Sequence, residues 1–140
     1  MPIMRSYGST FVDAIEAQCR EVPGRDVFRN SAGESLSYGQ LKERSDALAC
    51  WLGDASNVAA GVPVILYGHK SPHMLTGILA CAKSGHAYVP IDTIYPAERV
   101  AGIVGQIGET LVVDTTAGLL AWDAALGEGH PRVVGAPELE

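Results

Sequence analysis

Three uniformly apolar stretches mark the second half of the chain, at residues 62–67, 87–91 and 111–113. Short apolar runs without alternation are typical of strands buried on both faces of a parallel sheet. Between them, apolar residues recur at the spacing of one helical face: Leu75, Ile78, Leu79 and Ala82, then Val100, Ile103, Val104 and Ile107. The order strand, helix, strand, helix, strand predicts an α/β fold, a layered parallel sheet with flanking helices and right-handed crossovers.

Capping residues support this reading. Ser71 and Pro72 are typical of the N-cap and first turn of a helix, and Gly85 is typical of the position just past its C-terminal end. After the third apolar stretch the pattern weakens. It predicts only a short helix within 117–126 and a short strand at 132–134.

The N-terminal part predicts a helix on which Phe11, Ile15 and Cys19 share one face, with Ser9 or Thr10 as its N-cap. Two short strands follow at 26–29 and 35–37, joined by a turn. Ser37 and Gln40 then fit a capping box, which predicts a second helix. The apolar stripe of this helix consists of Leu41, Leu48 and Leu52, and Gly53 is expected to end it.

The composition narrows the function classes. The chain has 140 residues, which suits one domain, and its net charge is −6. Because Lys and Arg form no block, we expect neither a nucleic-acid partner nor a basic membrane-binding face. The apolar runs are much shorter than the roughly 20 residues that span a bilayer, and no signal-peptide pattern opens the chain. We therefore expect a cytoplasmic protein without membrane insertion.

The three cysteines, Cys19, Cys50 and Cys81, are odd in number and form no C-x-x-C pair. We therefore expect free, buried thiols in a reducing cytoplasm rather than a disulfide framework or a zinc site.

Two glycine-containing segments suggest the hypothesis of a nucleotide-binding site. Residues 67–71 read Tyr-Gly-His-Lys-Ser between a strand and a helix, but the G-x-x-x-x-G-K-[ST] pattern is not present, so a plain strand-to-helix turn is favoured. Gly102, Gly105 and Gly108 fall inside a predicted helix rather than between a strand and a helix. They do not form a dinucleotide-binding fingerprint.

The four histidines are candidate metal ligands. His69 and His73 are four residues apart, but the helix starts between them and no neighbouring carboxylate completes a ligand set. His86 and His130 have no partner that the sequence identifies. We therefore predict no metal site.

Asp92 is the strongest single polar candidate. It directly follows a predicted parallel strand, and ligands of open α/β sheets gather at that edge. The favoured alternative is that its carboxylate hydrogen-bonds the backbone of the following turn. No serine, cysteine or histidine lies in a recognisable nucleophile–base arrangement.

Three segments together resemble a known family. Residues 83–92, Lys-Ser-Gly-His-Ala-Tyr-Val-Pro-Ile-Asp, resemble the second core motif of amino-acid adenylation domains, approximately L-K-A-G-x-A-Y-V-P-I-D. Residues 95–100 look like that family's P-x-x-R segment, and residues 36–41 look like its L-T-Y-x-E-L segment. The order is preserved over essentially the whole chain, so the chain is identified as a member of the adenylate-forming enzymes. Within them, Ser84 and His86 resemble the D-alanine–D-alanyl carrier protein ligases.

The resemblance implies a two-step reaction in the full-length parent. ATP, with Mg²⁺, and D-alanine form an enzyme-bound adenylate, and the acyl group passes to the phosphopantetheine thiol of an acyl carrier protein for teichoic acid D-alanylation. The 140 residues read as one partial domain (1–140), truncated before the family's phosphate loop, whose N-terminal methionine indicates a natural start. The family motifs within it are expected to be architectural, with residues 87–91 as a core strand. We therefore assign no catalytic, cofactor-binding or metal residue and expect the chain alone to be inactive.

Three alternatives stay open at this point: an adenylation domain of a peptide synthetase, a non-catalytic interaction module, or a small nucleotide-binding α/β protein. The third is disfavoured because no glycine-rich loop lies between a strand and a helix. Half of a larger domain would expose apolar surface or a sheet edge, so we expect the chain alone to self-associate.

Overall fold

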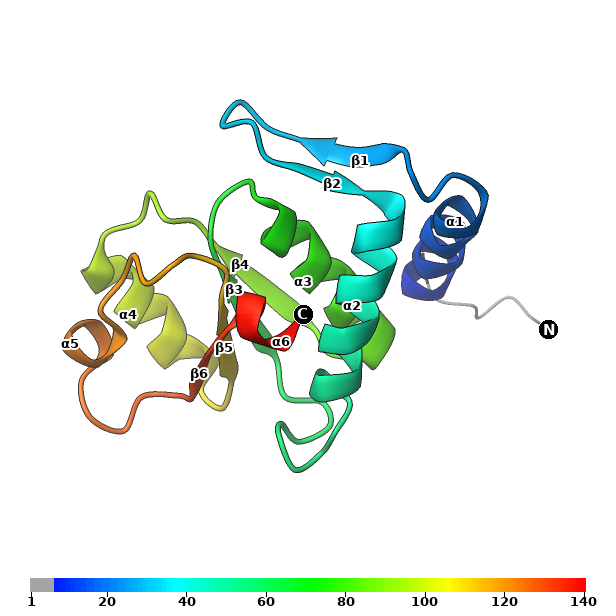
Figure 1. Cartoon of the computed structure of the whole chain (residues 1–140). Helices are drawn as coiled ribbons and strands as arrows, with labels where there is room; N and C mark the ends of the chain where they lie inside the picture. Colours follow the sequence, from blue (N-terminus) through cyan, green and yellow to red (C-terminus); the bar gives the residue numbers. More distant parts are fainter. Residues whose placement is uncertain (1–6) are drawn as a thin grey trace.

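The computed structural model describes residues 7–140, with side chains from residue 11 onward. Four parallel strands form its central sheet (Figure 1): β3 (Val64–Tyr67), β4 (Tyr88–Ile91), β5 (Leu111–Asp114) and β6 (Val133–Gly135). Their order across the sheet is β4-β3-β5-β6. The predicted α/β fold with a parallel sheet is therefore confirmed.

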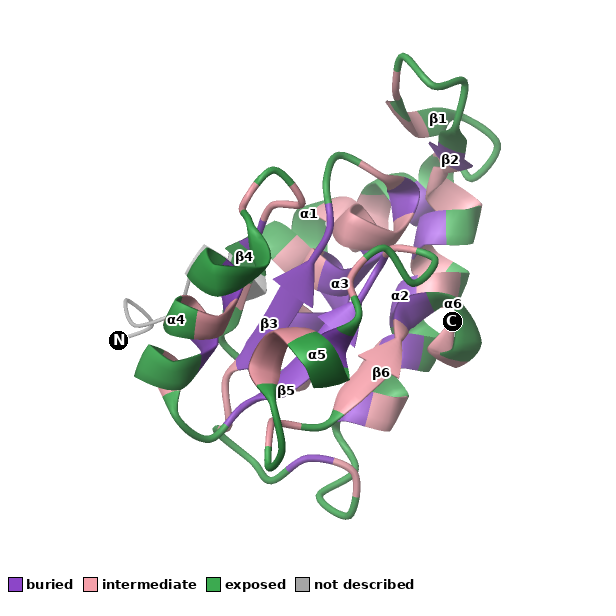
Figure 2. Cartoon of the chain, turned by 90° about the vertical axis from the view of Figure 1, so that its left-hand side faces the viewer, coloured by how far each residue is buried: buried purple, intermediate pink, exposed green. Residues whose placement is uncertain are grey.

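Helices cover both faces of this sheet. On one face lie α2 (Tyr38–Leu52) and α3 (Pro72–Ser84), and on the other lie α4 (Ala97–Ile107) and the short α5 (Trp122–Leu126). Alternate residues of β3 supply the two sides: Val64 and Leu66 pack toward α2 and α3, and Ile65 and Tyr67 toward α4 and α5. Both faces of β3 and β5 are thus buried in the middle of the molecule (Figure 2), which explains why their sequences lack polar alternation.

The N-terminal elements pack beside α2 and α3. They are helix α1 (Tyr7–Glu21) and an antiparallel hairpin of β1 (Asp26–Arg29) and β2 (Ser35–Ser37). A smaller apolar cluster centred on Leu36, Leu41 and Leu79 joins the hairpin to the two helices. The predicted cap at Ser9 or Thr10 is wrong, because the helix already begins at Tyr7 and both residues lie within it.

The other predicted caps are confirmed. Ser37 and Gln40 form a reciprocal capping box at the start of α2, and Gly53 follows its end. Ser71 Oγ accepts the backbone N–H of Met74 at the start of α3. Gly85, just past the end of α3, has a φ of 79°, in the left-handed region that favours glycine.

The C-terminal segment differs most from prediction. The helix predicted within 117–126 is reduced to α5, because Gly118 has a φ of 80° and interrupts any earlier helical turn. The predicted strand at 132–134 is confirmed with a shift of one residue, as β6. A one-turn helix, α6 (Ala136–Leu139), follows it and is too short to leave a periodic signal.

Strand β4 is an edge strand of this sheet, which corrects the expectation of a core strand at 87–91. Tyr88 is 42% exposed, and Pro90 is also exposed. The carbonyls of Ala87 and Ile91 accept N–H groups of Val64 and Gly68, so the alternate residues Tyr88 and Pro90 direct their backbone groups away from β3. Proline is tolerated there because it removes a donor only from the free edge, which also limits pairing with another strand.

No helix in the described residues combines the length and the apolar character that a membrane crossing requires.

Candidate functional site

The candidate site lies at the carboxyl ends of β3, β4 and β5. The chain runs from β3 outward to β4, then crosses back past β3 to β5, so the connections reverse direction between β3 and β5. Crevices at such a reversal are the usual ligand sites of open α/β sheets. Two cavities open at this edge, one on each side of the turn that joins β3 to α3.

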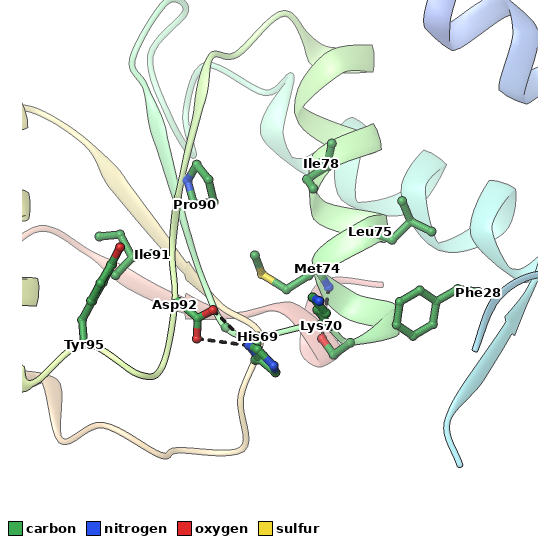
Figure 3. A pocket seen from close by; sticks show the side chains of 12 residues that line it. Phe28, His69, Lys70, Met74, Leu75, Ile78, Pro90, Ile91, Asp92 and Tyr95 are labelled. Atoms are coloured by element: carbon green, nitrogen blue, oxygen red, sulfur yellow. Dashed lines mark hydrogen bonds and ion pairs between the residues drawn. The ribbon is translucent and has the colours of Figure 1, made fainter. Parts of the chain in front are cut away.

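The first cavity has a volume of about 460 Å³, within the range of small-molecule sites. Figure 3 shows its lining. One wall comes from α3, a second from the end of β4 and the turn after it, and Phe28 of the hairpin closes the side. Its apolar side chains are Phe28, Met74, Leu75, Ile78, Pro90, Ile91 and Tyr95. His69, Lys70 and Asp92 contribute polar atoms to its lining.

The second cavity has a volume of about 560 Å³ and is more polar. It lies between the β1–β2 turn and the segment after β5, and it shares His69, Lys70 and Ser71 with the first cavity. The Asn30 amide donates to the Lys70 carbonyl over 3.1 Å. The hairpin is therefore attached to the turn that separates the two cavities.

His69 and Asp92 form an ion-pair contact at the shared mouth. Nδ1 of His69 lies 3.0 Å from Oδ2 and 3.1 Å from Oδ1 of Asp92. The backbone N–H of Ile94 also donates to Oδ1, and the Thr93 hydroxyl contacts the same oxygen. Desolvation opposes ionisation of Asp92, but the bonds from His69 and Ile94 outweigh it and hold the pKa of Asp92 below its usual value.

The favoured interpretation of Asp92 is thereby confirmed, because its carboxylate does bond the following turn. The pairing of Asp92 with His69 was not predicted from the sequence. A signal for it existed: Tyr67 and Ile91 are partners in the parallel register of β3 and β4, and His69 and Asp92 follow them by two residues and one residue. Residues just past the carboxyl ends of neighbouring parallel strands meet at one edge.

His73 points to a different carboxylate from His69. Its Nδ1 lies 2.7 Å from Oε2 of Glu140, whose side chain is only 3% exposed. Burial raises the pKa of Glu140, although His73 and Arg44 act in the opposite direction. The two histidines thus do not share a ligand set. Within residues 7–140, no group of three His, Cys, Asp or Glu side chains is placed to hold a metal ion.

The other two histidines also have partners that the sequence did not identify. His86 is buried, with Nδ1 2.8 Å from the Val62 carbonyl and Nε2 2.9 Å from the Leu52 carbonyl. His130 Nε2 lies 2.8 Å from Asp123, and this bond, with a second to the Pro131 carbonyl, raises the pKa of His130.

The turn after β3 is a plain strand-to-helix connection, as the sequence favoured. A Cβ placed on Gly68 would collide with the Thr115 hydroxyl and lie 3.0 Å from Sδ of Met74. That hydroxyl donates to the Tyr67 carbonyl over 2.9 Å. Gly68 therefore permits close approach of the segments after β3 and β5. Gly102 and Gly105 lie within α4, and Gly108 ends it, so they are not arranged around a phosphate site.

The motif residue Lys83 makes structural contacts at the opposite end of α3. Its Nζ lies 2.6 Å from Glu16, 2.7 Å from Asp46 and 2.8 Å from the Ser45 hydroxyl, and its side chain is 10% exposed. Desolvation of the two carboxylates acts against ionisation, but Lys83 and Lys42 outweigh it and lower the pKa of Glu16 and Asp46. This cluster joins α1, α2 and α3.

The chain is similar in sequence to proteins of known family. The family model described as "AMP-binding enzyme" matches residues 15–136. The D-alanine–D-alanyl carrier protein ligase of Bacillus cereus (strain B4264) is 38% identical over 108 residues, which are 76% of this chain and 21% of that protein. The ligase of the same name from Bacillus thuringiensis (strain Al Hakam) is 37% identical over the same shares. The chain therefore spans about a fifth of the length of these relatives.

Solved structures share the fold. The N-terminal subdomain of Klebsiella oxytoca NpsA superposes with a TM-score of 0.67 at 19% identity, covering 91% of this chain and 32% of that one. The nonribosomal peptide synthetase FmoA3 superposes with a TM-score of 0.76 at 23% identity, and the match covers 91% of this chain and 14% of FmoA3. The family match covers most of the chain, and its motifs lie in the elements that the sequence indicated. The chain belongs to the AMP-binding enzyme family.

Proposed function

We propose that this chain is the N-terminal part of a ligase that activates D-alanine with ATP and transfers it to a carrier protein. The observation that carries the proposal is the 38% identity to D-alanine–D-alanyl carrier protein ligase over 108 residues. In this reaction D-alanine attacks the α-phosphate of ATP, and D-alanyl adenylate and pyrophosphate form. The phosphopantetheine thiol of the carrier protein then takes the acyl group and AMP leaves, in support of teichoic acid D-alanylation. ATP as a substrate is consistent with a cytoplasmic location.

ATP and Mg²⁺ are assigned to the longer protein. The turn at Gly68 has one glycine, which is required for packing against Thr115, and the described residues offer no three-carboxylate or histidine set for a cation. The family's glycine-rich phosphate loop is not among the 140 residues. We therefore assign no catalytic residue to this chain and propose that it is inactive alone.

A peptide-synthetase adenylation domain is the second candidate. The observation that favours it is the fold likeness to FmoA3, with a TM-score of 0.76. A carrier protein is the acyl acceptor in either case: one fold neighbour is an artificially fused adenylation–PCP di-domain from Klebsiella oxytoca. A non-catalytic interaction module built from the same half-domain is the third.

We also propose that the isolated chain self-associates. Among the side chains that the structure describes, four large apolar ones are exposed: Phe11, Tyr88, Ile94 and Leu119. The first cavity adds an open apolar surface beside α3. Such surface favours association between chains. Light scattering tests this point, and a clean monomer that binds little hydrophobic dye would contradict it.

The function is tested by amino-acid-dependent ATP–pyrophosphate exchange, measured on the 140-residue chain and on the longest product of its gene. We expect exchange with D-alanine, little with L-alanine, and only in a product that extends beyond residue 140. Exchange with another amino acid in the long product would favour the peptide-synthetase alternative. Exchange by the 140-residue chain would overturn the proposed inactivity, and silence in every product would favour the interaction module.

A further inference from the structure

The first cavity lies between helix α3 and the edge strand β4. Val89 and Ile91 pack on the side of the sheet that carries α4, so the alternate residue Pro90 points to the other side, where α3 lies. Helix α3 packs on β3, and its residues Leu75 and Ile78 line the cavity together with Pro90 (Figure 3). An apolar face of α3 and an apolar face of β4 therefore enclose the same space.

The β1–β2 hairpin closes a further side of this cavity. Phe28 contributes the apolar ring, and the Asn30 amide, which donates to the Lys70 carbonyl over 3.1 Å, fixes the hairpin to the turn after β3. The volume of about 460 Å³ is in the range of small-molecule sites, and most of the lining residues are apolar. A cavity of this size and character favours a ligand with an apolar chain.

Lys70 adds a positive charge without a counter-charge to the lining of this cavity. Within the described residues, its ammonium group forms no ion pair. The two carboxylates that line the first and the second cavity have partners of their own: Asp92 is bonded to His69, and Glu34 is bonded to the Asn30 amide. An anionic group of a ligand is therefore favoured beside Lys70.

We propose that the first cavity binds an amphipathic anion. An unbranched apolar chain of about eight to ten carbons lies between α3 and β4, and a single anionic head, a carboxylate or a phosphate, lies beside Lys70. This ligand is distinct from the ATP and D-alanine of the proposed ligase reaction, for which we assign no residue of this chain. The complementary apolar lining and charge are the two features that select it.

Binding is tested by isothermal titration calorimetry of the 140-residue chain with hexanoate, octanoate and decanoate, each below its micelle concentration. We expect the affinity to rise about threefold per added methylene until the chain fills the cavity. Octanol should bind about fivefold more weakly than octanoate, because it lacks the charge that faces Lys70. Octyl phosphate, titrated beside octanoate, distinguishes a phosphate head from a carboxylate head.

Two results of this titration would overturn the proposal: no binding of any anionic probe, or equal affinity for octanoate and octanol. Because the titration contains neither ATP nor an amino acid, its outcome is independent of the pyrophosphate exchange that tests the ligase activity.

Substitutions at three exposed positions test where the ligand lies. Lys70→Gln should remove the preference for octanoate over octanol and leave the dependence on chain length. Arg29→Gln is the matched control, because Arg29 lines the second cavity and not the first, and it should change neither. Pro90→Phe should weaken the binding of every probe, since its ring occupies the cavity. Circular dichroism checks that each variant is folded. Equal effects of Lys70→Gln and Arg29→Gln, or unchanged binding by Pro90→Phe, would contradict the proposed site.

Discussion

The two ends of α3 hold charged side chains in opposite environments. At its N-terminal end, His69 and Asp92 are 58% and 35% exposed and lie at the mouth of two cavities. At its C-terminal end, Lys83 is 10% exposed and is enclosed by groups from α1 and α2. The family motif of residues 83–92 runs from the enclosed end, where Lys83 joins three helices, to the open end, where Asp92 lies. The space that can receive a ligand lies at the open end.

The residues that indicate the protein family and the residues that could contact a ligand are therefore partly different. Lys83 and His86 identify the family in the sequence, and both have structural contacts in the fold. The open end has a favourable place in the sheet and displays the histidine–carboxylate pair of His69 and Asp92. The two motif residues Lys83 and His86 therefore indicate the family while they stabilise the packing of the fold. Substitutions at the two ends should separate stability from ligand binding.

The largest loss of stability is expected from a substitution at the enclosed end of α3. Lys83→Met removes one of the two cations that face Glu16 and Asp46, and the remaining Lys42, 3.0 Å from each, compensates the two carboxylates only in part. We expect a loss of about 3 kcal/mol in the free energy of unfolding, measured by urea denaturation at neutral pH. The matched control is Lys70→Met at the open end, which should change stability by less than about 0.5 kcal/mol.

Acid should reduce the Lys83 effect. The pKa values of Glu16 and Asp46 are lowered in the fold, so their contribution is present above the unfolded value and is lost as pH falls through the lowered values. The gap between the wild type and Lys83→Met should therefore narrow below about pH 4. An equal cost at both ends of α3, or a gap that widens in acid, would contradict the comparison.

A substitution at Gly68 should show that the open end also contains one tightly packed position. Gly68→Ala places a Cβ against the Thr115 hydroxyl, so one of the two segments must shift. We expect a loss of about 2 kcal/mol in urea denaturation, typical of overpacking. Adding Thr115→Ala removes that hydroxyl, and the double variant should be less destabilised than the sum of the single changes. Additive costs would show that the two residues do not meet.

An intermediate loss of stability is expected when the His73–Glu140 pair is broken, because the carboxylate is buried and the histidine is partly exposed. His73→Ala leaves that carboxylate without its partner, since its Oε1 already has none. We expect a loss of about 1–2 kcal/mol at neutral pH. Glu140→Gln in the same background should recover most of it, and a loss that persists there would point to packing instead.

The pH dependence of this pair has a definite sign. Burial raises the pKa of Glu140, so the folded state favours the protonated acid. The contribution of Glu140 to stability is then greatest below the unfolded value of about 4.3 and decreases as pH rises through the folded value. Glu140→Gln should remove this decrease, which is read from urea denaturation midpoints at a series of pH values.

The smallest effect is expected for Asp92→Asn. Its contact with His69 is largely exposed, and exposed pairs contribute about 0–1 kcal/mol. Because the pKa of Asp92 is lowered, the contribution is present above about pH 4 and is lost as pH falls through the lowered value. Thermal melts of the two proteins should differ by little at neutral pH and converge in acid. A loss above about 2 kcal/mol would show that this pair is a structural element like Lys83.

The sequence by itself determined the order of the elements, the parallel sheet and most of the caps. These features depend on neighbours: the capping pair at Ser37 and Gln40 is three residues apart, and the runs of β3 and β5 are four residues long. Where the local signal was short, as in 117–126, one positive φ at Gly118 was enough to shorten the helix. The edge position of β4 had one local signal, Pro90, because proline lacks the N–H that a central strand donates. The apolar run by itself does not distinguish an edge strand from a central one.

The pairing of charged and polar groups was decided by the tertiary structure. His69 meets Asp92 across 23 residues, His86 meets Leu52 across 34, and His73 meets Glu140 across 67. The His69–Asp92 contact has a signal in the sequence, because both residues directly follow neighbouring parallel strands. The other two contacts have none, since they depend on which helix covers which face of the sheet. Local conformational preferences act within about one helical turn, whereas these contacts form only when distant elements pack on a common core.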